Sequence, residues 1–317
     1  MAGKTRESTA DAKKKAGGAR TGWDSSVITE RDLKAAKVSG YLSDRDEAMV
    51  PGGELVPRPP PGFRVMFLAF LCRGLSLPVH DFFRGLLFYY GLQLHHLAPN
   101  SILQVACFIT LCECYLGTYP HLGLWKHFFY PKRHSKDIIG GVGFSRLGGT
   151  GYFDMFMAES VIGWKRKWFY IKDRKASSEA LGLPEFVADA PLQRLARWKH
   201  TTTDEEELEV ALLVSKVEAL RVDSNLTRIQ LMTTFVRRRV QPLCARPRGM
   251  WLYEGPSDST RVVPTELSTS EIEKRVRVLT KFSSDDSPAY FPTAAAFSKD
   301  APLPEVNFIR FLSVSSA

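Results

Sequence analysis

Histidine and cysteine, the residue types that most often bind zinc, are concentrated in one part of this sequence. Six of the seven histidines and four of the five cysteines fall between residues 72 and 134. They are His80, His95, His96, His121, His127 and His134, with Cys72, Cys107, Cys112 and Cys114. Structural zinc sites use close ligand pairs, but Cys112 and Cys114 would point about 200° apart on a helix. We therefore expect no bound metal and no other cofactor.

Glu113 is a second candidate for chemistry, because it interrupts an otherwise apolar segment. A buried carboxylate needs a partner, and Arg73, Arg84 or His95 could supply one. We expect a salt bridge in the core, or a helix end that reaches solvent, rather than a catalytic acid.

Motifs for phosphate binding and for nucleophilic catalysis are absent from the sequence. The glycine-rich segment 140–151 fits neither G-x-x-x-x-G-K-[ST] nor G-x-G-x-x-G, because Arg146 stands where the third glycine should be. No serine lies in a G-x-S-x-G motif. We expect 140–151 to be a flexible connector, and we expect no small-molecule substrate.

Two basic groups are candidate contacts for nucleic acid. They are Lys165, Arg166 and Lys167, and Arg237, Arg238 and Arg239. The first group lies among the aromatic residues of segment 164–174, a pattern that could pair with phosphates and stack on single-stranded bases. A hairpin with one wet face would give the same pattern, and the helix dipole alone favours cations at a helix C-terminus. Both interpretations stay open from the sequence.

The elements that position these residues begin with a long segment dense in aromatic and aliphatic side chains. Glycines at its breaks favour three helices, over 63–73, 79–90 and 101–116. Ser101 and Gln104 have the spacing of a capping box at the start of the third helix. Because that helix is apolar on nearly every face, we expect it to be buried on all sides.

Downstream of this core, aromatic residues favour strands. Segment 152–173 predicts a β-hairpin, with the basic group 165–167 near its turn and the start of its second strand. Its strands would carry Tyr152, Phe153 and Phe156, then Trp168, Phe169 and Tyr170.

Three further helices are predicted, over 204–221, 226–240 and 269–280. Thr203 has the position of an N-cap for the first helix and Ser268 for the third. In the first helix, one apolar stripe is expected from Leu208, Leu212, Val217 and Leu220.

These elements predict a mainly α fold with a small β-hairpin, an α+β class with disordered tails at both ends. A basic, proline-rich disordered tail is expected over 1–60, and a helical core with the hairpin over 61–175. A linker over 176–200, a second helical region over 201–282 and a loose tail over 283–317 follow.

Composition narrows the class of protein. The 317 residues include 43 Lys and Arg against 34 Asp and Glu, a net charge of +9, which permits contact with nucleic acid without demanding it. A hydrophobic content of 44% excludes wholesale disorder. Five cysteines without a C-x-x-C pair indicate a reducing compartment, nucleus or cytoplasm. No apolar run reaches about 18 residues and no secretory signal begins the chain, so no membrane partner is expected.

Three motifs stand between Leu77 and Phe129: FFRGLLFYYGLQLHHLAPNSI, ACFITLCE and PHLGLWKHFF. In these motifs the segment resembles a domain of plant genomes, the gypsy-type transposon family, also described as a transposase of gypsy type. A looser likeness covers roughly residues 60 to 280. The resemblance implies a retrotransposon-derived protein and brings no assigned catalytic residues with it.

The enzymatic motifs of a complete retrotransposon are missing, namely D-[ST]-G, Y-x-D-D, an HHCC zinc segment and a zinc knuckle. We therefore expect a non-enzymatic protein, coat-like or nucleic-acid-associated, that binds RNA or DNA and self-associates. Two alternatives stay open. A domesticated protein-interaction module would expose an apolar face of residues 63–130. A transposase-like DNA-processing enzyme would hold Mg²⁺ with Asp81, Glu113 and Asp154.

Overall fold

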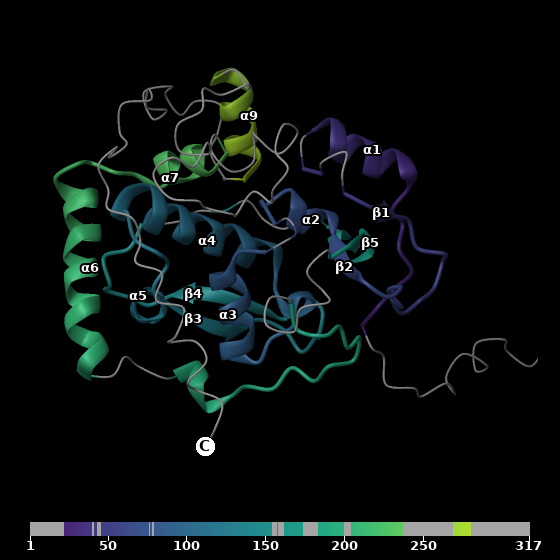
Figure 1. Cartoon of the computed structure of the whole chain (residues 1–317), viewed down its shortest axis with the longest axis horizontal. Helices are drawn as coiled ribbons and strands as arrows, with labels where there is room; N and C mark the ends of the chain where they lie inside the picture. Colours follow the sequence, from purple (N-terminus) through teal and green to yellow (C-terminus); the bar gives the residue numbers. More distant parts are fainter. Residues whose placement is uncertain are drawn as a thin grey trace, which may run out of the picture.

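A computed structural model of the chain shows a helical body with two small antiparallel sheets (Figure 1). It describes residues 22–39, 41–42, 46–75, 77, 79–153, 157, 162–173, 183–199, 204–236 and 269–279. The helices are α1 (Glu30–Val38), α2 (Leu68–Leu71), α3 (Asp81–Tyr90), α4 (Pro99–Thr110), α5 (Leu122–Phe128), α6 (Asp204–Val222), α7 (Arg228–Phe235) and α9 (Thr269–Leu279). The strands are β1 (Ala48–Met49), β2 (Phe63–Phe67), β3 (Phe129–Arg133), β4 (Val142–Arg146) and β5 (Trp168–Lys172). The short helical turns are η2 (Leu94–His96), η3 (Leu111–Leu116), η4 (Trp164–Arg166) and η5 (Ala196–Lys199). The expected fold class, mainly α with a small β component, is confirmed.

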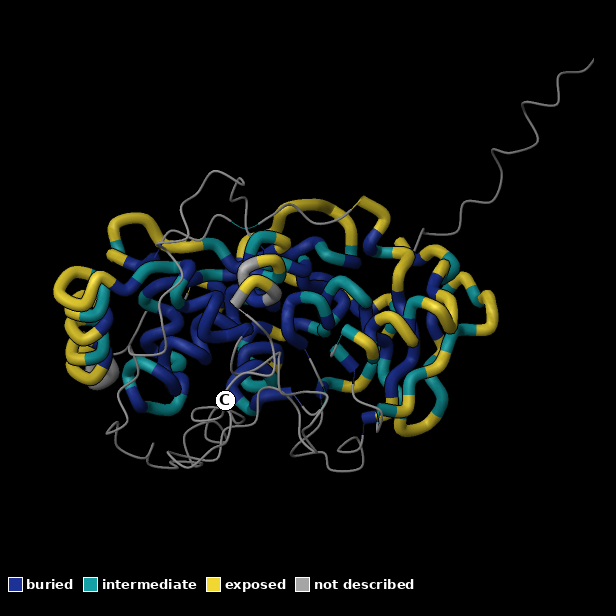
Figure 2. Tube along the Cα trace, turned by 90° about the horizontal axis from the view of Figure 1, so that it is seen from above, coloured by how far each residue is buried: buried dark blue, intermediate teal, exposed yellow. Residues whose placement is uncertain are grey.

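The centre of the core is α4 together with the π-helical turn η3 that continues it (Figures 1 and 2). The run Pro99–Leu116 has the length and hydropathy of a membrane-spanning helix, and 83% of it is buried inside the protein. Gly117, with a left-handed φ of 66°, ends this run. The helix expected over 101–116 is therefore confirmed as the buried central helix.

The start of α4 differs from the expected capping box. Ala98 is the N-cap and Pro99 takes the first helical position. Because proline already has the φ of a first helical residue, the helix begins before Ser101. Ser101 lies inside the first turn, and its buried hydroxyl has no hydrogen-bond partner in the structure.

Helix α3 agrees with the expected segment 79–90. The Nδ1 atom of His80 accepts the backbone N–H of Phe82 at 3.0 Å and so caps the helix. Gly91 ends it at φ 62°, and an added Cβ there would lie 2.6 Å from the Leu195 side chain. The left-handed backbone conformation favours glycine here, and a side chain would also displace the end of Leu195.

Residues 63–67 form strand β2, so the helix expected over 63–73 is wrong for its first part. β2 pairs antiparallel with one side of β5, with Phe67 opposite Trp168, and β1 pairs with the other side. Aromatic and β-branched side chains in both strands favour this pairing. The two strands lie far apart in the sequence, so local periodicity carries no sign of it, and helix remains only in α2.

The described residues between 22 and 60 belong to the folded body, so the tail expected over 1–60 is wrong for this part. Trp23 is buried, and its Nε1–H donates to the carbonyl oxygen of Ala188 at 2.7 Å. Its ring stacks on Phe67 with the centroids 5.8 Å apart. α1 also buries its apolar side in the core. The prediction of a tail rested on the charged, proline-rich composition of this segment, which does not reveal the few apolar residues that anchor it.

The hairpin of the structure is formed by β3 and β4, not by segment 152–173. These strands pair antiparallel with Phe129 opposite Arg146. Segment 140–151, expected as a flexible connector, therefore contains strand β4. Tyr152 does not pair with β5; its ring packs against Phe129 with the centroids 4.7 Å apart.

The C-terminal helices pack on the central core. α7 lies against α4, and α6 lies against α5 and η3. Leu231 and Met232 of α7 belong to the same buried cluster as α4. The expected linker 176–200 also contributes, because Trp198 donates its Nε1–H to the carbonyl oxygen of Tyr90 at 2.8 Å. The two expected helical regions therefore share one core.

The helix expected over 226–240 is described as α7, which Thr227 caps by accepting the N–H of Gln230 at 3.3 Å. The helices expected over 204–221 and 269–280 correspond to α6 and α9. Predicted features that lie outside the described residues are Phe156, Thr203, Ser268, residues 1–21 and the tail 283–317.

Candidate nucleic-acid interface

The basic segment 165–167, in and after η4, is fixed to the body through its backbone. The carbonyl oxygen of Arg166 accepts the N–H of Val27 at 2.9 Å. That of Lys167 accepts the N–H of Leu68, also at 2.9 Å. The three basic side chains therefore project from backbone positions that two separate parts of the fold hold in place.

The side chains of this segment differ in their partners. The Nζ atom of Lys165 lies 2.7 Å from Oδ2 of Asp137, and this hydrogen bond and charge lower the pKa of the Asp137 carboxyl. Arg166 and Lys167 are exposed. Among the described residues, neither of these two forms an ion pair, so both charges face solvent.

The loop between β3 and β4 packs directly against η4. Gly140 in this loop has a φ of 68°, and a Cβ added there would lie 2.5 Å from the ring of Trp164 and 3.7 Å from Cε of Lys165. Only a residue without a side chain permits this approach. The loop brings a second run of cations beside the segment 165–167.

Arg133, in the second run of cations, holds the chain that follows β3. Its guanidinium donates to the carbonyl oxygens of Ser135 at 2.9 Å and Lys136 at 3.1 Å. Lys132 and Lys136 are exposed. The contact of Gly140 with Trp164 and the ion pair of Lys165 with Asp137 bring two basic segments close together. We call their cations, Lys132, Arg133, Lys136, Lys165, Arg166 and Lys167, the basic cluster. Sequence reasoning missed its first three members, although the run K-R-H-S-K was a usable signal.

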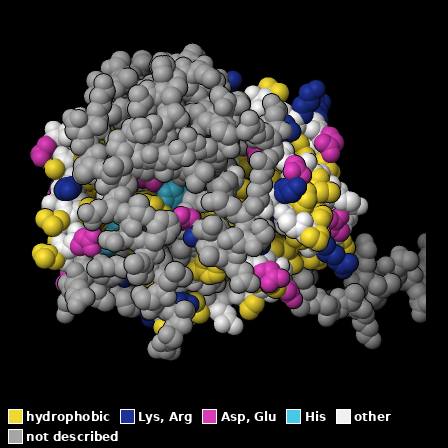
Figure 3. All heavy atoms as spheres, in the orientation of Figure 1, with side chains coloured by type: hydrophobic (Ala, Val, Ile, Leu, Met, Phe, Trp, Pro, Cys, Tyr) yellow, Lys and Arg dark blue, Asp and Glu magenta, His cyan; other side chains and the backbone are white. Residues whose placement is uncertain are grey.

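Further positive charge lies near the basic cluster on the N-terminal helix. The basic residues of α1 are Arg31, Lys34 and Lys37. Lys167 and Arg31 both help to lower the pKa of Asp32, after the larger effect of its hydrogen bonds with Thr29. Figure 3 shows Lys and Arg side chains gathered at the upper right, over α1, with acidic side chains among them.

The aromatic residues beside the basic cluster fill the core. Trp168 and Phe169 have no exposed surface, and Tyr170 is 3% exposed. The indole N–H of Trp168 donates to the carbonyl oxygen of Asp24 at 3.0 Å. These rings cannot stack on bases, so of the two contacts that segment 164–174 could make, the described residues offer only the pairing of cations with phosphates.

The second predicted group, Arg237, Arg238 and Arg239, lies outside the described residues. The structure therefore places one of the two predicted groups, and joins it to a neighbour that the sequence analysis did not select.

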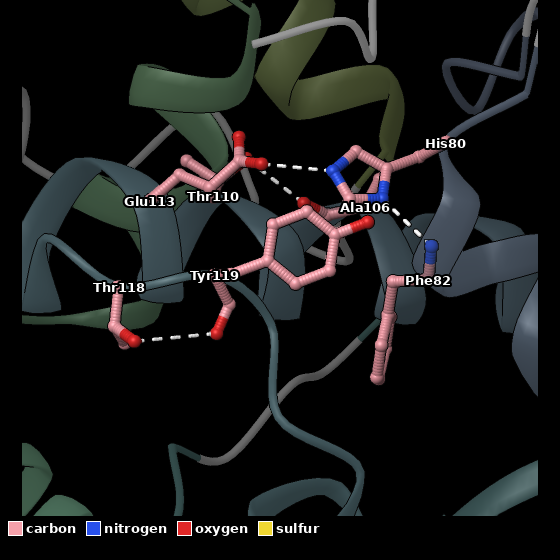
Figure 4. A network of polar contacts seen from close by, with 7 residues as sticks. All are labelled: His80, Phe82, Ala106, Thr110, Glu113, Thr118 and Tyr119. Carbon is pink, nitrogen blue, oxygen red and sulfur yellow. Dashed lines mark hydrogen bonds and ion pairs between the residues drawn. The ribbon is translucent and has the colours of Figure 1, made fainter. Parts of the chain in front are cut away.

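Glu113, the candidate acid, is fully buried in η3 and pairs with His80 (Figure 4). Oε1 of Glu113 lies 2.8 Å from Nε2 of His80. Because Nδ1 of the ring accepts the N–H of Phe82, the ring proton lies on Nε2 and donates to the carboxylate. The expected core pairing is present, but it is made with His80, which was not among the expected partners Arg73, Arg84 and His95.

The two expected arginine partners are engaged elsewhere. The Nε atom of Arg73 donates to Oδ1 of Asn100 at 2.9 Å. Arg84 lies 3.4 Å from Oδ1 of Asp81, a residue of its own helix. His80 escaped the sequence analysis because it precedes α3, whereas Glu113 lies at the far end of the central helix.

Tyr119 lies over this pair, with its ring centroid 5.3 Å from that of His80 (Figure 4). Burial raises the pKa of Tyr119, and the carboxylates of Asp81 and Glu113 raise it further. Since Glu113 has no exposed surface, this network is a closed core element that holds α3 against η3.

The metal hypotheses find no support in the part of the chain that the structure describes. It contains no group of three His, Cys, Asp or Glu side chains that could hold a metal ion. Cys107, Cys112 and Cys114 are buried, and burial raises the pKa of the Cys107 and Cys112 thiols. Of the carboxylates proposed for Mg²⁺, Asp154 lies outside the described residues.

The described residues within 63–130 do not form the apolar face expected for an interaction module. Among the described residues of this stretch, one large apolar side chain is exposed, that of Phe88, at 52%. The stretch is the core of the protein.

Comparison with known proteins gives the family of this core. Residues 65–133 match the model of a family described as "Putative gypsy type transposon". The chain carries a gypsy-type transposon domain. The match confirms the resemblance read from the sequence, and it spans β2 to β3 with α3, α4 and α5 between them. A search of curated proteins and a search of solved structures gave no match.

The gypsy-type transposon domain contributes Lys132 and Arg133 to the basic cluster, at the end of β3. The segment 165–167 lies beyond the matched residues. The cluster is therefore shared between the domain and the part of the chain that folds onto it.

Proposed function

We propose that this transposon-derived protein is non-enzymatic and binds RNA or DNA by neutralising backbone phosphates with the basic cluster. The observation that carries this proposal is the packing of the β3–β4 loop on η4, through Gly140 on Trp164 and Asp137 on Lys165, which brings the basic segments 132–136 and 165–167 close together. The cluster has six cations, and Asp137 is paired with one of them. The net charge of +9 adds a long-range attraction for a polyanion.

Phosphate contact is the mode that this surface favours. The rings nearest to it are buried, so base stacking contributes nothing, and exposed Lys and Arg side chains recognise phosphate without regard to sequence. Such binding is salt-dependent, because each neutralised phosphate releases counterions. The proposal places the protein in the nucleus or cytoplasm, where nucleic acid is present. A coat-like role would require copies of the chain to bind one another as well.

Fluorescence anisotropy with a labelled RNA hairpin and a labelled DNA duplex tests this function. We expect the full chain to bind both at low salt. The logarithm of the binding constant should fall linearly with the logarithm of the salt concentration, with a slope near −0.9 per phosphate contact on duplex DNA. Absence of binding at low salt to either probe, or binding that salt does not weaken, would overturn the proposal. Tighter binding to one probe would identify the preferred nucleic acid.

A further inference from the structure

Helix α6 has apolar side chains on two opposite faces. Its inner face packs on α5 and η3 and buries Val210 and Val217, which are 4% and 1% exposed. On the other side, Leu208, Leu212 and Val222 are 75%, 61% and 60% exposed. The single apolar stripe expected from the sequence is therefore wrong, because Leu208 and Leu212 point away from the face that holds Val217.

The outer residues of α6 follow the spacing of a coiled-coil seam. Leu208, Leu212, Ser215, Ala219 and Val222 are separated by four, three, four and three residues, and all five are exposed. We call these residues the α6 seam. A 4-3-4-3 spacing places side chains at the a and d positions of a heptad, the positions that pack against a second helix. Val210 and Val217 then take the f position, opposite the seam, in agreement with their burial.

The place of α6 in the molecule leaves its seam accessible. The helix lies along one edge of the body, at the end opposite to α1 (Figures 1 and 2). Nothing in the described fold covers the seam, since its large side chains keep more than half of their surface exposed. A partner helix could therefore approach without rearrangement of the core.

We propose that the α6 seam binds the α6 seam of a second copy of this chain in antiparallel orientation. Charge selects the orientation. Glu209 and Lys216 both take the e position, and antiparallel helices bring e positions together, so each Lys216 meets Glu209 of the other copy. A parallel pair would instead set Lys216 against Ala211 and Glu218 against Asp223, which offers no attraction and one repulsion.

Both side chains that would make this contact reach the surface of the protein. Lys216 is exposed and forms no ion pair with a described residue. Glu209 lies 3.5 Å from Nε2 of His121 in its own chain and keeps 53% of its side chain exposed. Each Glu209–Lys216 pair occurs twice in a symmetric dimer, because a two-fold axis repeats every contact.

The size of the seam sets the strength of the dimer. A helix of 19 residues is about 28 Å long, and two such helices bury less than the ~1,600 Å² of a standard interface. The helix is already folded on the body, so association carries no cost of ordering it. We expect a reversible dimer with a Kd of about 10 µM.

Sedimentation velocity of the full chain without nucleic acid tests this proposal, and it does not depend on the proposed function. The wild-type chain should shift from monomer to dimer as its concentration rises through about 10 µM. The double variant Leu208→Glu/Leu212→Glu should stay monomeric. The control Leu55→Glu/Ile162→Glu changes two apolar residues that are 68% and 99% exposed elsewhere, and it should dimerise as the wild type does. A monomeric wild-type chain, or equal dimerisation of the two double variants, would overturn the proposal.

A charge exchange tests the orientation. Lys216→Glu alone and Glu209→Lys alone each set like charges together twice, and each should weaken dimerisation about ten-fold. An equimolar mixture of the two variants should restore it, because every pair is again of opposite charge. Unchanged dimerisation of the single variants, or a mixture no better than either variant alone, would overturn the antiparallel arrangement.

Discussion

The Nε2 atom of His80 lies 2.8 Å from Oε1 of Glu113, and the carboxylate has no exposed surface. This contact joins the start of α3 to the turn that ends the central helix. The other ring nitrogen of His80, Nδ1, accepts the backbone N–H of Phe82 and so caps α3. One histidine therefore ties together two helices of the gypsy-type transposon domain.

Removing Glu113 should destabilise the protein strongly. Glu113→Ala leaves the buried N–H of His80 without an acceptor and opens a cavity, and we expect a loss of about 3 kcal/mol in the free energy of unfolding. Glu113→Gln keeps an oxygen that can accept this N–H, and it should cost about 1 kcal/mol. Urea unfolding followed by circular dichroism measures both. Equal costs for the two variants would show that the hydrogen bond contributes nothing.

Stability should fall as the solution becomes more acidic, because of His95. Burial, together with the neighbouring His96, lowers the pKa of His95 from 6.5 to about 3. Between these values the unfolded chain binds a proton that the folded chain does not, so the free energy of unfolding decreases by about 1.4 kcal/mol per pH unit below pH 6.5. The loss begins near pH 6.5 and levels off near pH 3.

His95→Leu isolates this contribution. Both ring nitrogens of His95 are buried without a hydrogen-bond partner, so an apolar side chain removes no bond. Between pH 7.5 and pH 5.0, we expect the wild-type chain to lose about 2 kcal/mol more than the variant in urea unfolding. His96 remains in both proteins and cancels in the comparison. Identical pH profiles would contradict the assignment to His95.

The capping of the two helices α4 and α7 can be compared directly. The Ser101 hydroxyl has no partner in the structure, whereas Thr227 accepts the N–H of Gln230 in a capping box. Ser101→Ala should leave the melting temperature unchanged or raise it. Thr227→Ala should cost about 1 kcal/mol in the free energy of unfolding. A larger loss for Ser101→Ala would mean that Ser101 caps α4 after all.

The packing of Gly140 on Trp164 should control the basic cluster. Gly140→Ala introduces a Cβ 2.5 Å from the ring and must displace the loop that carries Lys136 and follows Lys132 of β3. We expect a loss of about 2 kcal/mol in stability and weaker binding to an RNA hairpin. Gly163→Ala is the matched control, because its φ is also positive but no atom lies within 4 Å. Equal RNA binding by the two variants would show that the position of the β3–β4 loop does not affect binding.

Local sequence patterns were sufficient for the elements with strong boundaries. The helices ending at Gly91 and Gly117 were predicted because a left-handed glycine stops an apolar run whatever surrounds it. The pairing of β2 with β5 was not predicted. Each strand is a short apolar segment that could equally be a helix, and its partner lies far along the chain. The burial of Trp23 was not predicted either, because its partners Phe67 and Ala188 lie far from it in the sequence.

The candidate site was predicted in part. The segment 165–167 was found by its composition, and so was the buried pairing of Glu113. The partner of Glu113 and the contribution of Lys132 depend on packing between distant segments, through His80 in one case and Gly140 in the other. Burial of the rings beside the cluster also depends on the sheet, which composition does not reveal.

The dependence of binding on salt in matched variants tests the role of the basic cluster most directly. Arg166→Ala/Lys167→Ala removes two exposed cations of the cluster, and Arg58→Ala/Lys199→Ala removes two exposed cations outside it. Anisotropy with a DNA duplex should show a slope smaller in magnitude by about 2 for the first variant, with affinity at low salt lower by about ten-fold or more. The second variant should keep the wild-type slope. Equal slopes for all three proteins would contradict the proposal that the basic cluster contacts phosphates.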